Sequence, residues 1–180
     1  AVRLGRRVGQ SWRSHRFSGP FLRDLLLDRG YIVETMETAT TWSGLVALHA
    51  DLTAELERRL REASGGRALV ITHVSHVYDT GASLYVTALA PAADDRRAQW
   101  WVAKKAAGEV LMAAGATITH HQGVGTDHVP WMTHEVGDLG LAAVRAVKDA
   151  WDPAGVLNPG KLIPPAPAGT PATSIDTVRG

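Results

Sequence analysis

A repeated change of hydrophobic period along residues 31–119 constrains the fold more than any other feature of the sequence. Residues 31–38 alternate between the two sides of an extended chain, which is typical of a strand. From residue 41 the period becomes helical, and a Gly-Gly pair at residues 65–66 ends that predicted helix. One stripe of the helix consists of Leu45, Leu48, Leu52, Leu56 and Leu60.

The rest of this region adds three more strands and one more helix to the prediction. Residues 68–77 and 82–90 alternate as strands, and a tight turn joins them. A second long helix opens and runs within residues 91–115, and residues 116–119 form a fourth short strand. The order strand, helix, strand, turn, strand, helix, strand predicts an α+β fold: a ferredoxin-like antiparallel sheet with its helices on one face.

The composition along the chain predicts four parts. Residues 1–17 form a basic connecting arm, and residues 18–126 hold a short helix and the ferredoxin-like domain. Residues 127–163 form a C-terminal helical segment with a closing loop, and residues 164–180, rich in Pro, Ala, Thr and Gly, form a disordered tail. The second face of the sheet has no helix, so we expect another domain, a second subunit or a cofactor to cover it.

Charge and cysteine content exclude several classes of function. The 19 Lys and Arg residues and 18 Asp and Glu residues leave a net charge of +1, so we expect no nucleic-acid partner. The absence of cysteine excludes disulfides and thiolate nucleophiles. No apolar run reaches the roughly 20 residues that span a bilayer. The final Val178-Arg179-Gly180 is not a peroxisomal signal, and with the Ala- and Arg-rich composition this favours a bacterial cytoplasmic location.

Two groups of polar residues in the first two thirds of the chain are candidates for a site. Arg23, in an otherwise apolar helical segment, could bind a phosphate or carboxylate, or could simply pair with Asp24. In the predicted hairpin, strand alternation places His73 and His76 on opposite faces, which argues against a shared metal site. The hairpin also carries Ser75, Tyr78 and Tyr85.

A third candidate group, His120 and His121, follows the predicted fourth strand. Adjacent side chains in an extended segment point opposite ways, so we do not expect the pair to chelate one ion. A site made of His73, His120 and a carboxylate is a minor alternative, and we predict no metal. Further on, two prolines and two glycines within residues 152–162 predict an irregular ordered loop, which either wraps the domain or presents polar side chains to a ligand.

Several motifs together resemble one enzyme family. The segment DPAGVLNPGKL at residues 152–162 is similar to the closing motif of FAD-linked oxidases of the vanillyl-alcohol oxidase type. PFLRDLLLDRGYIVETMETATTW, SHVYDTGASLYVT and THHQGVG resemble the C-terminal, substrate-binding half of the alkyldihydroxyacetonephosphate synthases and their bacterial homologues. The resemblance extends from about residue 20 to residue 163. It implies FAD as the cofactor, bound mainly by an upstream domain that is missing from this sequence.

The resemblance also assigns roles to individual residues. Arg23 would bind the phosphate of the substrate, and Tyr85 would be the phenol beside the flavin and the reacting carbon. His120 and His121 would place the flavin and take part in proton transfer, and the resemblance leaves open whether Tyr85 or His121 takes the proton. Eukaryotic synthases have a third histidine where this chain has Gln122, which cannot exchange a proton near neutral pH.

In the closing loop the same resemblance places two residues near the cofactor. Asn158 and Lys161 fall on the matching positions of the family motif. The ammonium group of Lys161 is a candidate to stabilise negative charge on the reduced ring.

The activity implied by the resemblance is the exchange of the acyl group of acyl-dihydroxyacetone phosphate for a fatty alcohol, a step of ether-lipid synthesis. Two alternatives stay open: an FAD-linked oxidoreductase acting on a 2-hydroxy acid or alcohol, and a non-enzymatic ferredoxin-like domain with Tyr85 and His121 in a packed core. The expected partners are FAD, a phosphate- or carboxylate-bearing substrate and the upstream domain. A homodimer and contact with a membrane surface are left open, and the fragment alone is expected to be inactive.

Overall fold

The computed structural model describes residues 5–164 and divides the chain into two compact units, one ending at Gln122 and one beginning at Gly123. Residues 1–4 of the predicted arm, and all of the predicted tail after residue 164, lie outside the described residues. Among the helices of the described part, none is long and apolar enough to cross a membrane.

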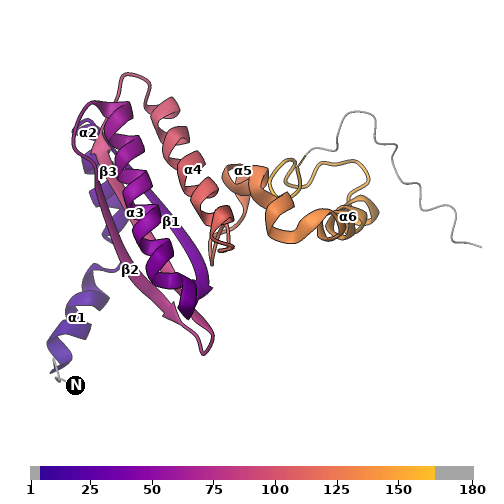
Figure 1. The fold of residues 1–180 in the computed structure, drawn as a ribbon, viewed down its shortest axis with the longest axis horizontal. Helices are drawn as coiled ribbons and strands as arrows, with labels where there is room; N and C mark the ends of the chain where they lie inside the picture. The colour runs from indigo at the N-terminus through magenta and orange to yellow at the C-terminus, as the bar shows by residue number, and fades with distance from the viewer. Residues whose placement is uncertain (1–4, 165–180) are drawn as a thin grey trace, which may run out of the picture. The chain divides into compact units, whose positions relative to one another are not determined.

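The first unit contains the predicted strands and helices in their predicted order, up to residue 113, and a helix within the predicted arm (Figure 1). The α+β class and the antiparallel sheet are confirmed. The elements are α1 (Gly5–His15), α2 (Gly19–Asp28), β1 (Tyr31–Thr41), α3 (Trp42–Ser64), β2 (Leu69–Val77), β3 (Gly81–Pro91) and α4 (Arg96–Ala113).

The hydrophobic core lies between the sheet and the helices α3 and α4, which pack against each other over one face (Figure 1). The predicted leucine stripe of α3 is buried, apart from the half-buried Leu45. Alternate residues of β3 are buried against these helices, and removal of this apolar area from water stabilises the fold. Gly65 ends α3 in the left-handed conformation, with a φ of 65°, as predicted.

The sheet has three strands in the order β1-β3-β2, and the fourth strand predicted at residues 116–119 does not form. Thr117 still lies against β1, because its N–H donates to the Ala39 carbonyl at 3.0 Å. However, the Ala39 N–H donates to Oγ1 of Thr117 at 2.8 Å rather than to a backbone carbonyl. The backbone turns at Gly115 and His121, where φ is 61° and 56°. The segment is therefore too short to extend a ladder.

A β-bulge at Ser75 changes which side chains share a face of the sheet. In β2, His73 pairs with Tyr85 of β3, and His76 pairs with Ser83, with a register shift between them. Tyr85 and Ser83 are two residues apart on β3 and so point to the same face. The prediction that His73 and His76 lie on opposite faces was therefore wrong, because the extra residue reverses the alternation.

The second unit contains α5 (Gly125–His128), the 3₁₀ helix η1 (Val129–Trp131) and α6 (Met132–Trp151). The largely helical prediction for this region is confirmed, but Gly137, with φ 69° and ψ 169°, interrupts α6. Residues 152–162 form an irregular loop, as predicted.

Candidate functional site

Polar and aromatic side chains line the face of the sheet that α3 and α4 do not cover. Glu37, Tyr85 and His73 occupy one row of the register across β1, β3 and β2. Ser83 and His76 occupy the next row of β3 and β2. Because antiparallel strands place directly opposed residues on the same side, these five side chains share one surface.

Tyr78, in the turn between β2 and β3, joins three histidines into what we call the Tyr78 cluster: Tyr78, His76, His120 and His121. The Tyr78 hydroxyl lies 3.0 Å from Nε2 of His120 and 3.4 Å from Nε2 of His121. The His76 ring lies 4.5 Å from that of His121 and 5.4 Å from that of His120, measured between centroids. The cluster thus brings a phenol and three imidazoles together at one end of the sheet.

Local backbone geometry allows both adjacent histidines to reach Tyr78. His121 has a φ of 56°, in the left-handed region that non-glycine residues rarely adopt. The hydroxyl of Thr119 donates to the carbonyl of Gln122 at 2.8 Å and closes this turn. The two imidazoles meet edge to face with 4.2 Å between ring centroids. Our expectation that His120 and His121 point apart was wrong because the segment is not extended.

Glu37 contacts two histidines of the Tyr78 cluster, His120 and His76. Its carboxylate is 7% exposed and accepts a hydrogen bond from the Ser75 hydroxyl at 2.5 Å. Nδ1 of His120 lies 3.4 Å and Nδ1 of His76 lies 3.5 Å from the same oxygen of Glu37. Burial would raise the pKa of Glu37, but the hydrogen bonds of Ser75 and His120, and the two imidazoles nearby, lower the pKa below its ordinary 4.5.

The three histidines of the cluster could also hold a metal ion. Ligand nitrogens of His76, His120 and His121 all lie within 4.8 Å of one another. Imidazole nitrogens are common ligands of zinc and other transition metals. The minor alternative formulated from the sequence named His73 instead, which stacks on Tyr85. That no metal is needed stays a prediction.

Tyr85 and Arg23 have partners other than the histidines of the cluster. The Tyr85 ring is half-buried and stacks on His73, with 5.1 Å between centroids. Arg23 is exposed on α2, and its guanidinium donates to Asp24 at 3.4 Å. The local pairing considered from the sequence is therefore present, although exposed pairs of this kind contribute at most about 1 kcal/mol.

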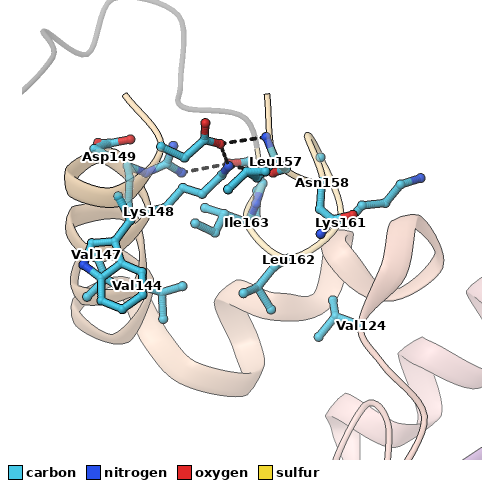
Figure 2. Close-up of a pocket in the computed structure, with 15 residues that line it drawn as sticks. Val124, Val144, Val147, Lys148, Asp149, Leu157, Asn158, Lys161, Leu162 and Ile163 are labelled. Carbon is cyan, nitrogen blue, oxygen red and sulfur yellow. Dashed lines mark hydrogen bonds and ion pairs between the residues drawn. The ribbon is translucent and has the colours of Figure 1, made fainter. Parts of the chain in front are cut away.

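The closing loop of the second unit lines a pocket of about 730 Å³ (Figure 2). Asn158 and Lys161 belong to its wall, and Asn158 has a φ of 45°. Figure 2 shows the Lys161 side chain extending away from Lys148 and Ile163. Apolar side chains make up much of the remaining wall: Val124, Val144, Val147, Trp151, Leu157 and Leu162.

Asp152 organises this loop. Its buried carboxylate accepts hydrogen bonds from the backbone N–H groups of Val156 at 3.0 Å and Leu157 at 2.9 Å. Lys148 of α6 pairs with the same carboxylate and also donates to the Leu157 carbonyl at 2.6 Å. The bond from Lys148 and that from Leu157 hold the pKa of Asp152 below its ordinary value. The loop that presents Asn158 is therefore fixed to α6.

Comparison with known proteins identifies the family. Residues 5–162 match the model of the FAD linked oxidases, C-terminal domain. The chain belongs to this family. FAD is accordingly its cofactor.

Within this family, the chain is similar to several individual proteins over most of its length. The chain is 33% identical over 165 residues to alkyldihydroxyacetonephosphate synthase of Dictyostelium discoideum, covering 91% of this chain. It is 32% identical over 169 residues to the synthase of Trypanosoma brucei brucei, covering 93% of this chain. In both cases the chain spans 27% of the length of the relative. A solved structure of alkyldihydroxyacetonephosphate synthase superimposes with a TM-score of 0.62 at 25% identity, over 89% of this chain and 25% of that one.

Each of the two units carries groups that suit contact with FAD. In the first unit, the Tyr78 cluster offers hydroxyl and imidazole groups on the sheet face opposite α3 and α4. In the second unit, Asn158 and Lys161 lie in a pocket wall that is otherwise largely apolar. These groups suit a ring that is both apolar and hydrogen-bonding.

Tyr78 was noted in the hairpin group of candidates without a role, and Glu37 was not among the residues selected from the sequence. Tyr78 lies beside the Asp79-Thr80-Gly81 turn, and proximity to a tight turn was the signal available. Glu37 is the acidic residue of β1 on the face opposite the one that α4 covers. Its role depends on the bulge at Ser75, which strand alternation does not reveal.

Proposed function

We propose that the chain is the substrate-binding part of a longer FAD-dependent enzyme of alkylglycerone-phosphate synthase type. Such an enzyme exchanges the acyl group of acyl-dihydroxyacetone phosphate for a fatty alcohol, a step of ether-lipid synthesis. The observation that carries the proposal is 31–33% identity to three relatives named alkyldihydroxyacetonephosphate synthase, over 88–93% of the chain. The domain that holds most of the FAD would lie in the part of such a protein outside these 180 residues.

The exchange places chemical demands that residues of this chain could meet. The bond from carbon to the acyl oxygen breaks, a bond to the alcohol oxygen forms, and a fatty acid leaves without net oxidation. The phosphate needs an anion site, and Arg23 retains donors beyond its single bond to Asp24. The reacting carbon needs a nearby group that takes and returns a proton, for which His120 and His121 are the candidates.

The remaining site residues have supporting roles in this proposal. FAD, when bound, supplies an electron-accepting ring system. Asn158 and Lys161 would contact the cofactor, and Lys161 would add a positive charge beside it. Tyr85 is proposed as the phenol at the reacting carbon on the strength of the family motif, and Tyr78 is a second phenol, already bonded to His120.

A second function is favoured by two other relatives. The chain is 27% identical over 112 residues to a mitochondrial D-lactate dehydrogenase [cytochrome] of Arabidopsis thaliana and 39% identical over 54 residues to glycolate oxidase subunit GlcD of Bacillus subtilis. An FAD-linked oxidoreductase for a 2-hydroxy acid could use Arg23 to bind the substrate carboxylate. A non-enzymatic domain is less well supported, since His121 is exposed and Tyr85 is only half-buried.

Absorbance of the flavin separates the two enzymatic functions. The full-length protein is mixed anaerobically with D-lactate or glycolate, and separately with acyl-dihydroxyacetone phosphate and a fatty alcohol. The proposal predicts an oxidised flavin with the hydroxy acids and formation of the ether product with the second mixture. Rapid bleaching by a 2-hydroxy acid, without ether product, would replace the synthase proposal by the oxidoreductase.

A further inference from the structure

Glu37 is a buried acid on the face of the sheet opposite α3 and α4. Its side chain is 7% exposed, whereas that of His76, on the far side of β3 in strand β2, is 46% exposed. A buried carboxylate is costly unless hydrogen bonds or charges compensate the lost water. The compensating groups are the hydroxyl of Ser75, 2.5 Å away, and the imidazoles of His120 and His76.

We propose that Glu37 is a positioning residue that holds the proton of His120 on Nδ1 and thereby leaves Nε2 to accept the hydrogen bond of Tyr78. The inference rests on the proposed function for its meaning in the reaction. The position of the proton on His120 is nevertheless a property of the folded chain, and it can be measured without any activity.

The argument follows from the hydrogen-bonding capacity of each group. An ionised carboxylate only accepts hydrogen bonds, so the contact of 3.4 Å between Glu37 and His120 requires the proton on Nδ1 of His120. A neutral imidazole carries a single N–H. Its Nε2 is then an acceptor, and the Tyr78 hydroxyl 3.0 Å away is the donor.

The other contacts of Glu37 and Tyr78 agree with a proton on Nδ1 of His120 and with Tyr78 as the donor to Nε2. Tyr78 has one proton, which it donates to His120. In the longer contact of 3.4 Å, Nε2–H of His121 is therefore the donor and the Tyr78 oxygen is the acceptor. His76 is a weaker partner of Glu37, because its Nδ1 lies closer to the hydroxyls of Ser75 and Ser83, at 3.2 and 3.3 Å, than to the carboxylate.

Within the proposed function this arrangement prepares His120 to take a proton. Nε2 of His120 has a free electron pair directed at the phenol, and proton transfer from the Tyr78 O–H would give a phenolate and an imidazolium. The negative charge of Glu37 would stabilise that imidazolium through Nδ1, as carboxylates do for other catalytic histidines. A side chain that only fills space could not stabilise the imidazolium in this way.

The decisive test is the tautomer of His120. In the protein labelled with ¹⁵N-histidine, long-range ¹H–¹⁵N spectra distinguish a protonated from an unprotonated ring nitrogen, and His120→Gln assigns the signal. We expect the Nδ1–H form in the parent at pH 8. Glu37→Gln should shift His120 toward Nε2–H, Glu37→Asp should retain part of the parent pattern, and Glu109→Gln on the exposed face of α4 should change nothing.

Two results would overturn the inference. One is a parent protein in which His120 carries its proton on Nε2, which needs no variant and therefore does not depend on Glu37→Gln folding. The other is a folded Glu37→Gln protein, judged by near-ultraviolet circular dichroism, with an unchanged His120 tautomer.

Turnover of the full-length enzyme separates this inference from the proposed function. With the exchange reaction, Glu37→Gln should lower kcat by about 100-fold with little change in KM, because general acid–base catalysis contributes on this scale. A changed tautomer with an unchanged kcat would leave the positioning role standing and would contradict the use of His120 in the proposed reaction.

Discussion

The hydroxyl of Tyr78 lies 3.0 Å from Nε2 of His120, although 42 residues separate them in the chain. Tyr85, the phenol that the family motif selects, instead stacks on His73. The hairpin of β2 and β3 therefore presents two phenols with different partners, one hydrogen-bonded to an imidazole and one packed on an imidazole. This difference gives the two tyrosines separable roles.

Replacing each phenol by phenylalanine tests these roles. In the full-length enzyme we expect Tyr85→Phe to abolish turnover while the protein stays folded, as the family motif implies. Tyr78→Phe removes the hydrogen bond to His120 and should lower kcat by about tenfold, the value of a typical hydrogen bond. Steady-state kinetics and circular dichroism provide the measurement. Normal turnover of Tyr85→Phe would remove Tyr85 from the mechanism.

Affinity for FAD tests the proposal that most of the cofactor is bound elsewhere in a longer protein. We expect the 180-residue chain to bind FAD weakly or not at all, because the domain proposed to hold most of the cofactor lies outside it. Quenching of FAD fluorescence during titration measures the affinity. A stoichiometric yellow complex that survives gel filtration would be incompatible with this expectation.

Sequence patterns predicted the fold well where a local feature, such as the hydrophobic period of one helix, is enough to decide the structure. The leucine stripe of α3 and the turn at residues 79–81 are both confirmed. The fourth strand was mispredicted because a hydroxyl of Thr117, not a carbonyl, receives the N–H of Ala39. Such a competition between side chain and backbone leaves no trace in the hydrophobic period.

The candidate site was predictable only in part, for a related reason. His120 and His121 were selected from the sequence, and the structure places them together with Tyr78. Their proximity to His76 depends on the bulge at Ser75 and on the positive φ of His121. Both are local departures from regular backbone that a strict alternation rule excludes.

Gly81 supports the turn next to Tyr78, and its substitution should be costly. A Cβ at this position would lie 2.0 Å from the Thr40 carbonyl oxygen, which is backbone and cannot rotate away. We expect Gly81→Ala to lower the free energy of unfolding by about 2–3 kcal/mol, as overpacking does. Urea denaturation measures the change. The matched control is Gly9→Ala in α1, where nothing lies within 4 Å of the new Cβ and stability should not fall. Equal stabilities would show that the turn relaxes.

Glu55 predicts a specific dependence of stability on pH. Hydrogen bonds from Arg58 and Arg59 lower the pKa of Glu55 from 4.5 to about 2. Because the pKa is lower in the folded state, the stabilisation is complete above pH 4.5 and is lost as the pH falls through about 2. These pairs are partly exposed, so Glu55→Gln should cost about 0.5–1 kcal/mol at pH 7 and much less near pH 2.

The measurement is urea denaturation of parent and variant at several pH values. Glu109→Gln, which removes an ion pair of 3.8 Å with Lys105, is the control and should follow the parent. A difference between parent and Glu55→Gln that is the same at pH 7 and pH 2 would contradict the assignment.

The most direct test of the proposed synthase activity follows the product itself. The full-length enzyme is incubated with acyl-dihydroxyacetone phosphate and a radiolabelled fatty alcohol, with His120→Gln as the matched variant. We predict that the label appears in an ether-linked phosphate, with one fatty acid released for each ether formed, and that His120→Gln loses this product. Labelled ether absent from the parent reaction, with FAD bound and both substrates present, would contradict the account.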